Sequence, residues 1–217
     1  MILIYFTAFL FLFDFFAKYF LNDTNPKSRW FLIHFVGNIA IAISCMGSVW
    51  SLLHDPIHTL MNPTTNNLPL DLVTILHIYH LARYECTTAD YFHHFLFVTA
   101  GNIIRFTTNS GEILPMTVVF VCGFPGAIDY MALYLIDKKI ISKHTRINIS
   151  VVINTWIRAP GLMFCFTLQY IAWMNEPKTL VNNMMFLCGS IVTFFNGQYY
   201  LQQVLLTAGK KYSIVGS

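Results

Sequence analysis

The stretch that decides the fold is Trp30–Leu53, WFLIHFVGNIAIAISCMGSVWSLL, which runs for 24 residues without an Asp, Glu, Lys or Arg. An α-helix rises about 1.5 Å per residue, so about 20 mainly apolar residues cross the hydrocarbon core of a bilayer. Turn-forming residues flank the run, with Asn22–Ser28 before it and Pro56 and Pro63 after it. The stretch therefore predicts a membrane-spanning helix.

Similar apolar runs recur along most of the chain. They predict spans at Met1–Leu21, Trp30–Leu53, Pro69–Leu81, Thr88–Ile104, Leu114–Ile136, Ile149–Trp173 and Leu180–Leu206. The third and fourth runs are short, so six spans is the main alternative to seven. Only 11% of the residues are charged and 56% are hydrophobic, whereas a soluble domain carries about 25% charged residues. We expect an all-α, polytopic membrane bundle of about seven transmembrane helices, with no separate soluble module.

The basic residues are distributed unequally between the two sets of loops. Nine fall on one side and two, Arg105 and Lys178, on the other. The nine are Lys27, Arg29, Arg83, Lys138, Lys139, Lys143, Arg146, Lys210 and Lys211. Because Lys and Arg are retained in cytoplasmic loops, we predict a lumenal or extracellular amino terminus and a cytosolic carboxyl terminus. The glycosylation sequons at Asn22 and Asn148 then face the cytosol and are expected to stay unmodified.

The sequence gives no support for a cleaved signal peptide, for a nucleic-acid partner, or for a zinc or redox site. Met1–Leu21 lacks a basic n-region and a small-residue cleavage site, so it is expected to be a retained span and not a signal peptide. No basic stripe interleaved with aromatic residues is present, so we expect no nucleic-acid partner. The five cysteines are scattered singly without C-x-x-C spacing, which favours packing over zinc binding or redox chemistry.

Histidines gather where the third and fourth predicted spans meet. H-x-x-H (His77, His80) ends one span and D-x-x-H-H (Asp90, His93, His94) begins the next. The connection is only a few residues long, so the two helices should be antiparallel neighbours and the two motifs should meet. Asp90 lies at i−3 and i−4 from the histidine pair, where a carboxylate can fix a tautomer and raise the basicity of a general base. We therefore interpret His93, His94 and Asp90 as candidate catalytic residues.

Other intramembrane polar residues are expected to lie in the same half of the bilayer. His34 and Asn38 follow Trp30 at one-turn intervals, while Asp129 and Arg158 lie deeper, at similar depth, and form a candidate ion pair. We group these four with His77 and His80 as candidate substrate or cavity residues. For each, a structural role in an interhelical hydrogen bond or ion pair is the alternative. Pro125 and Pro160 should kink their spans and open space for a ligand.

A metal site is the other chemical interpretation of the histidine cluster. Imidazole and carboxylate side chains are suited to iron or zinc. Membrane di-iron lipid oxidases use more histidines, in several clusters, so we assign no metal ligand and expect no bound cofactor.

These motifs, in their order and spacing, resemble the TLC-domain family, which includes translocation-associated membrane proteins, ceramide synthases and the ceroid-lipofuscinosis membrane protein. The resemblance covers about Arg29 to Leu206. It rests on Arg29-Trp30 with His34 and Asn38, Asp55-Pro56, Leu76–His80, Asp90–His94, and Asn154 with Trp156–Arg158. One departure is that Phe95–Ile104 contains no acid, whereas the longer ceramide-synthase motif has further aspartates there.

The resemblance implies a helical bundle around a cavity open to the cytosol, in the endoplasmic reticulum. It divides the chain into a first span and loop (1–28), a TLC-like domain (29–209) and a short cytosolic tail (210–217). It implies membrane lipids as partners and a role in lipid metabolism, with acyl transfer from acyl-CoA to a lipid amine or alcohol and His93 and His94 as the catalytic pair. A non-enzymatic factor in lipid homeostasis or trafficking is the second hypothesis, and a metal-dependent lipid oxidase the third. The lipid and the oligomeric state stay open.

Overall fold

The computed structural model describes residues 1–107, 111–175, 177 and 179–215, with the side chains of 89, 92, 93, 97, 107 and 211–215 left out. All regular elements in these ranges are helical. In chain order they are α1 (Ile2–Tyr19), α2 (Pro26–His54), α3 (Pro56–Met61), α4 (Leu68–Arg83), α5 (Thr88–Thr107), α6 (Ile113–Val118), η1 (Val119–Gly123), α7 (Phe124–Asp137), α8 (Lys143–Ile153), η2 (Asn154–Arg158), α9 (Ala159–Asn175), α10 (Leu180–Ser190), η3 (Ile191–Phe195) and α11 (Asn196–Val215). The three η elements are π-helical turns.

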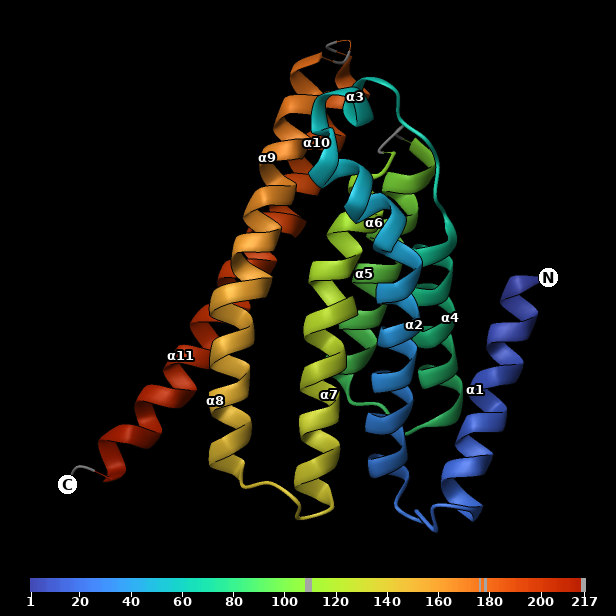
Figure 1. The fold of residues 1–217 in the computed structure, drawn as a ribbon, viewed down its shortest axis with the longest axis vertical. Coiled ribbons are helices and arrows are strands. Elements are labelled where there is room, and N and C mark those ends of the chain that lie inside the picture. Colours follow the sequence, from blue (N-terminus) through green and yellow to red (C-terminus); the bar gives the residue numbers. More distant parts are fainter. Residues whose placement is uncertain (108–110, 176, 178, 216–217) are drawn as a thin grey trace.

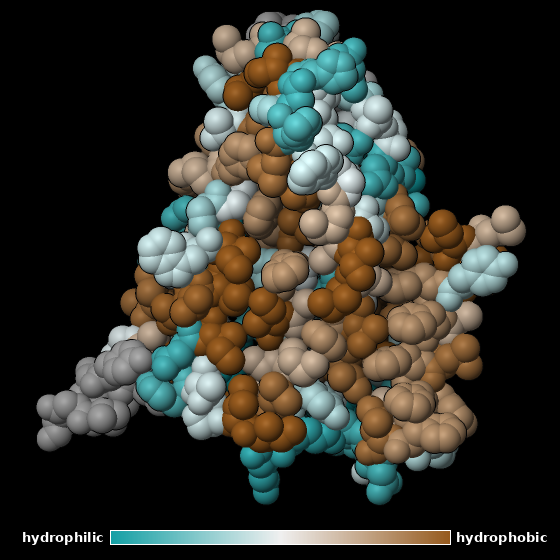
Figure 2. Space-filling model, viewed as in Figure 1, coloured by the Kyte–Doolittle hydropathy of each residue, from teal (hydrophilic) through white to brown (hydrophobic). Residues whose placement is uncertain are grey.

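Each π-helical turn joins two α-helices into one long rod, which gives the bundle its long members (Figure 1). Within the described residues, five helices are long and apolar enough to cross a membrane: Ile2–Tyr19, Pro26–His54, Ile113–Asp137, Lys143–Asn175 and Leu180–Lys210. Figure 2 shows apolar side chains over the middle of this face and hydrophilic ones at its lower end. The chain is therefore an integral, multi-pass, helical membrane protein.

The two short predicted spans are also helices. α4 has 16 residues and α5 has 20, and both pack within the bundle, α4 against α1 and α2, and α5 against α4 and α10. Neither belongs to the five long apolar helices. The physical reason is that α4 is short and that Asp90, Arg105 and a histidine pair lower the hydropathy of α5.

Two predicted boundaries were wrong. α8 begins at Lys143, six residues before the predicted Ile149, because Ser142 caps the helix by accepting a hydrogen bond from the Thr145 amide at 3.0 Å. The Asn148 sequon thus lies inside a helix. α11 continues to Val215, beyond the predicted end of the last span at Leu206. Apolar runs indicate the part of a helix that matches the membrane core, whereas capping decides where the helix begins.

Small residues bring the central helices close together. A Cβ atom added at Gly126 of α7 would lie 2.7 Å from the Asn38 amide of α2, and one at Gly37 would lie 2.8 Å from the Leu76 side chain of α4. Transmembrane helices associate through such close contacts because lipid offers no hydrophobic driving force between them. α2 consequently lies at the centre, between α4 and α7.

A buried carboxylate holds α1 to this centre. Asp14 is 3% exposed, and its oxygens accept hydrogen bonds from Arg29 at 2.8 Å, Tyr84 at 2.9 Å and Arg83 at 3.3 Å. Burial, together with the nearby Asp14, raises the pKa of the Tyr84 phenol, so its hydroxyl stays a donor. The charges of three helices compensate one another here, as buried charges require.

Replacing this carboxylate should destabilise the fold. Asp14→Asn leaves the buried Arg29 without its carboxylate, and loss of one partner of a buried ion pair costs about 3–5 kcal/mol. We expect a loss of unfolding free energy of that order in detergent titrations. The control is Asp137→Asn, because Asp137 accepts only an exposed hydrogen bond from Asn25. Equal stability of the two variants would contradict the anchoring of α1 by Asp14.

Two glycines in long helices should respond oppositely to alanine. A Cβ atom at Gly161 would lie 2.2–2.5 Å from the Phe120 ring, whereas one at Gly47 would have nothing within 4 Å. We expect Gly161→Ala to destabilise the protein by about 1–3 kcal/mol through overpacking. Gly47→Ala should be neutral or stabilising by up to about 1 kcal/mol, because alanine favours the helix. Thermal unfolding of both variants in the same detergent tests the pair, and the same sign for both would refute the tight contact between Gly161 and Phe120.

Candidate functional site: a polar-ended cavity in the bundle

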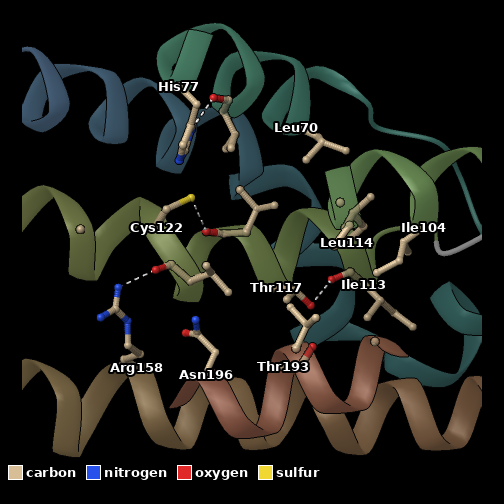
Figure 3. Close-up of a pocket in the computed structure, with 18 of the residues that line it drawn as sticks. Leu70, His77, Ile104, Ile113, Leu114, Thr117, Cys122, Arg158, Thr193 and Asn196 are labelled. Atoms are coloured by element: carbon tan, nitrogen blue, oxygen red, sulfur yellow. Dashed lines mark hydrogen bonds between the residues drawn. The ribbon is translucent and has the colours of Figure 1, made fainter. Parts of the chain in front are cut away.

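A cavity of about 440 Å³ lies inside the bundle, within the range of about 300–1,000 Å³ typical of ligand pockets. Long helices and π-helical turns both contribute to its wall, as the labelled residues in Figure 3 show for α4, η1, η2 and α11. All three π-helical turns contribute lining residues, among them Val121, Arg158 and Thr193. Such turns are frequent at functional sites because they displace side chains from regular helical positions.

The lining differs between the two ends of the bundle. At one end of the bundle, α2 and α5 begin and α7 terminates. Polar and aromatic residues line the cavity towards this end: Trp30, His34, Asn38, His77, Asp90, His94, Asp129 and Tyr130. Mostly apolar residues line it towards the opposite end: Leu70, Ile104, Ile113, Leu114, Trp173, Met185 and Phe186. The cavity thus has the polarity of an amphiphile with one polar head and an apolar tail.

The H-x-x-H and D-x-x-H-H motifs meet, as predicted. His94 of α5 and His80 of α4 share a hydrogen bond of 2.6 Å between Nε2 and Nδ1. The rings of His77 and His94 lie edge to face with centroids 4.5 Å apart. His80 is fully buried, whereas His77 and His94 line the cavity. The side chain of His93 lies outside the described residues.

The main chain assigns tautomers to two of the imidazoles. Nδ1 of His77 lies 2.7 Å from the Val73 carbonyl oxygen, and Nδ1 of His34 lies 3.1 Å from that of Trp30. A carbonyl only accepts, so Nδ1 carries the proton in both rings. In neutral form, each ring then has its basic nitrogen at Nε2. For His34 this nitrogen accepts from the Trp30 indole at 3.4 Å.

Aromatic rings cover the histidines from α2 and α7. Trp30 stacks on His80 with centroids 4.7 Å apart, and Tyr130 lies 4.5 Å from His34. Tyr130 thus lies beside the imidazoles, a position that the sequence motifs did not indicate. His34 and Asn38 are each 3% exposed and line the cavity.

Asp90 lines the cavity, but its hydrogen bonds go to the start of its own helix. Its Oδ2 accepts from the amide and the hydroxyl of Thr87, both at 2.8 Å, and the Thr87 hydroxyl accepts from the Asp90 amide at 3.2 Å. This is a capping box, which satisfies donors that a helix start leaves unpaired. Thr87 three residues before Asp90 was the sequence signal for it. The carboxylate therefore stabilises the first turn of α5.

The predicted ion pair between Asp129 and Arg158 was wrong. Asp129 accepts from Ser150 at 2.5 Å and lies 3.5 Å from Arg146. Both partners are on α8, which begins early enough to bring Arg146 opposite Asp129. Arg158 instead donates to the carbonyls of Phe120 at 3.4 Å and Val121 at 2.5 Å (Figure 3).

Local sequence explains why these carbonyls are available. The amide of residue 125 would normally donate to Val121, but Pro125 has no N–H. The amide of Phe124 donates to Val119 in the π-helical turn, which leaves Phe120 without its usual donor. Arg158 therefore satisfies two backbone acceptors that would otherwise be unpaired inside the membrane. Proline with an intramembrane arginine on a neighbouring helix was the signal that could have predicted this contact.

The geometry among the described residues does not resemble a metal centre. No group of three or more His, Cys, Asp or Glu side chains there is arranged to hold a metal ion. His80 and His94 approach each other to 2.6 Å and bond directly. Two imidazoles ligating one ion at about 2.0–2.1 Å in tetrahedral geometry would place their nitrogens farther apart than this.

Comparison with known proteins adds no assignment: no family model, no curated protein and no solved structure matches this chain. The resemblance to the TLC-domain family thus rests on the sequence motifs alone, and the role of the cavity has to be inferred from its own chemistry.

Proposed function

We propose that this protein is a seven-span, TLC-type membrane protein of the endoplasmic reticulum that binds a lipid in its cavity and transfers an acyl chain to a lipid amine or alcohol. The observation that carries the proposal is the two-ended cavity, with imidazoles at one end and apolar side chains at the other. A polar head and an acyl tail match these two ends. In this proposal α4 and α5 add two spans to the five long apolar helices. The support is that α4 packs against α1 and α2 and that α5 packs against α10, which all belong to those five.

The orientation follows from the distribution of charge. The connections after α1, α4 and α7 lie at the same end of the bundle, which is the lower end in Figure 1. Lys27, Arg83, Lys138 and Lys139 lie there, and the cavity histidines lie nearer to this end than to the other. In the proposed topology this end faces the cytosol, the source of acyl-CoA.

In the proposed reaction, His94 acts as general base towards the acceptor. When its Nε2–H donates to His80 Nδ1, Nδ1 of His94 is the basic nitrogen, and His80 orients the ring. His94 takes the proton of the acceptor amine or hydroxyl as this attacks the thioester carbonyl. The new C–N or C–O bond forms, the C–S bond breaks, and the proton passes to the thiolate to give free coenzyme A.

A non-enzymatic lipid-binding role is the second candidate. It is favoured by the hydrogen bonds of the histidines, because the bond between His80 and His94 joins α4 to α5. His34 and His77 bond to residues one turn earlier in their own helices, which fixes their rings in place. In that role the cavity binds a lipid and the histidines only maintain its polar end.

A single substitution tests the orientation. The segment Asn62-Pro63-Thr64 follows α3 and is not a glycosylation sequon only because proline is its middle residue. We expect Pro63→Ala to be glycosylated at Asn62 when the protein is synthesised into endoplasmic-reticulum membranes, seen as a glycosidase-sensitive mass shift. The sequons at Asn22 and Asn148 should stay unmodified. Glycosylation at Asn22, with no glycosylation at Asn62 of the Pro63→Ala variant, would show that the topology is the reverse of the proposed one.

Enzyme assays separate the two candidate functions. With acyl-CoA and long-chain amines or alcohols, we expect His94→Gln to reduce turnover by at least about 100-fold, the usual contribution of a general base. Lipid binding should persist in this variant. His58→Gln is the control, since His58 lies on the exposed helix α3. A folded His94→Gln protein with unchanged turnover would exclude the proposed base, and a parent protein that binds lipid without turnover would favour the second candidate.

A further inference from the structure

Arg158 lies in the middle of its membrane-spanning rod. It is 15 residues after Lys143 and 17 before Asn175, the ends of the span, which places it more than about 20 Å along the helix from either end. The residue is 8% exposed and lines the cavity. A charge at this depth is costly, and such residues normally mark a binding or transport site.

The guanidinium group keeps unused hydrogen-bonding capacity. Arginine has five N–H donors. The described residues supply three acceptors, the carbonyls of Phe120 and Val121 and, at 3.3 Å, Oδ1 of Asn154. The Tyr200 ring lies 4.6 Å from the guanidinium carbon and adds a cation–π contact. Two donors therefore have no acceptor among the described residues.

The positive charge also lacks a bound counter-charge. All of its hydrogen-bonding partners in the described chain are neutral. Asp129, the acid on the facing helix, is already bound to Ser150 and Arg146. Buried charges are normally paired. The Asp129 carboxylate interacts with Arg158 electrostatically, but no acidic side chain among the described residues is in direct contact with the guanidinium.

A second polar side chain beside Arg158 also lacks a partner. Asn196 is 9% exposed, lines the cavity, and its Oδ1 has no hydrogen bond in the described region. Figure 3 shows the side chains of Asn196 and Arg158 on the same wall of the cavity, both directed towards η1. A buried amide without a bond is costly, unless a ligand completes it. Because Oδ1 only accepts, the ligand group that completes it must carry an O–H or N–H donor, whereas the two remaining N–H groups of Arg158 are complementary to an oxyanion.

The cavity continues from this pair into its apolar end. Ala172 and Trp173 line it on the same rod as Arg158, up to 15 residues further on, which corresponds to about 22 Å of helix. Met185 and Phe186 line the same end. An anion bound at Arg158 thus has an apolar channel beside it that suits one long hydrocarbon chain.

We propose that Arg158 binds the oxyanion head group of a single-chain lipid and that Asn196 Oδ1 accepts a hydrogen bond from a hydroxyl of the same head group, with the lipid tail in the apolar end of the cavity. Arg158 binds one or both anionic oxygens through its two remaining donors. Lysophosphatidate, which carries a free hydroxyl near its phosphate, supplies both groups. The site stands independently of acyl transfer, because none of the histidines takes part in it.

Equilibrium binding to the purified full chain in detergent tests the site. The probes share an eighteen-carbon tail: oleate, oleyl alcohol and oleoyl lysophosphatidate, with inorganic phosphate as the free anion. We expect the parent protein to bind oleate or lysophosphatidate at least about tenfold tighter than oleyl alcohol, as charge-assisted hydrogen bonds imply. Inorganic phosphate at millimolar concentration should not compete.

Variants of Arg158 and Asn196 test whether these residues cause the preference for anionic lipids over oleyl alcohol. Arg158→Gln should reduce the preference for the anionic lipid to less than about twofold while oleyl alcohol binds as before. Asn196→Ala should weaken the binding of lysophosphatidate, which has a hydroxyl donor near its phosphate, and leave the binding of oleate unchanged. Lys143→Gln, which removes an exposed charge, should leave the preference for the anionic lipid unchanged. Equal binding of oleate and oleyl alcohol by the parent protein overturns the proposal without recourse to a variant. A preference that survives in Arg158→Gln overturns the assignment to Arg158, and competition by inorganic phosphate shows a site for a free anion and not for a lipid.

Discussion

The structure depends on one constraint: inside a bilayer, polar groups have no water and must be satisfied by the protein. Helices meet this requirement for most of the backbone. The proline at position 125 breaks it locally and leaves the Val121 carbonyl without an amide donor. Arg158 on the neighbouring rod donates to that carbonyl and to the carbonyl of Phe120. Backbone carbonyls in one span thus accept hydrogen bonds from an arginine in another span. These bonds hold the two rods together at the depth where the cavity lies.

The same constraint explains the other polar clusters. Asp14 in α1 is surrounded by donors from α2, α4 and the loop after α4, and His80 and His94 bond to each other across α4 and α5. Each cluster specifies which helices are neighbours more strictly than apolar contacts do, because an unsatisfied donor or charge costs far more in hydrocarbon than an imperfect packing contact. Small residues such as Gly126 then permit the close approach that these bonds need.

The polar groups available to bind a ligand are those whose hydrogen bonds within the protein are incomplete. The capping box of Asp90 and Thr87 is complete and structural, and Asp129 is held by Ser150 and Arg146. Arg158 and Asn196, in contrast, keep donors and acceptors that no described residue uses. In a cavity with one polar and one apolar end, these are the groups with capacity for a ligand. Catalysis and lipid binding can therefore occupy different parts of one cavity, with the histidines nearer the cytosolic side and Arg158 at mid-depth.

The sequence by itself determined the helical membrane class, the order of the helices and the meeting of the two histidine motifs, because apolar run length and a short turn between spans act locally along the chain. Helical rise alone placed Asp129 and Arg158 at similar depth, deeper than Asp90, but the ion pair inferred from that depth was wrong. The partner that each buried charged side chain binds depends on the rotation of its helix about the helix axis, on the capping at Ser142 and on the carbonyls that Pro125 leaves without a donor. The position of a residue along its helix gives its depth in the membrane but none of these three factors. The tertiary structure decided that Asp129 binds Arg146, that Asp90 caps its own helix, and that Arg158 faces the cavity.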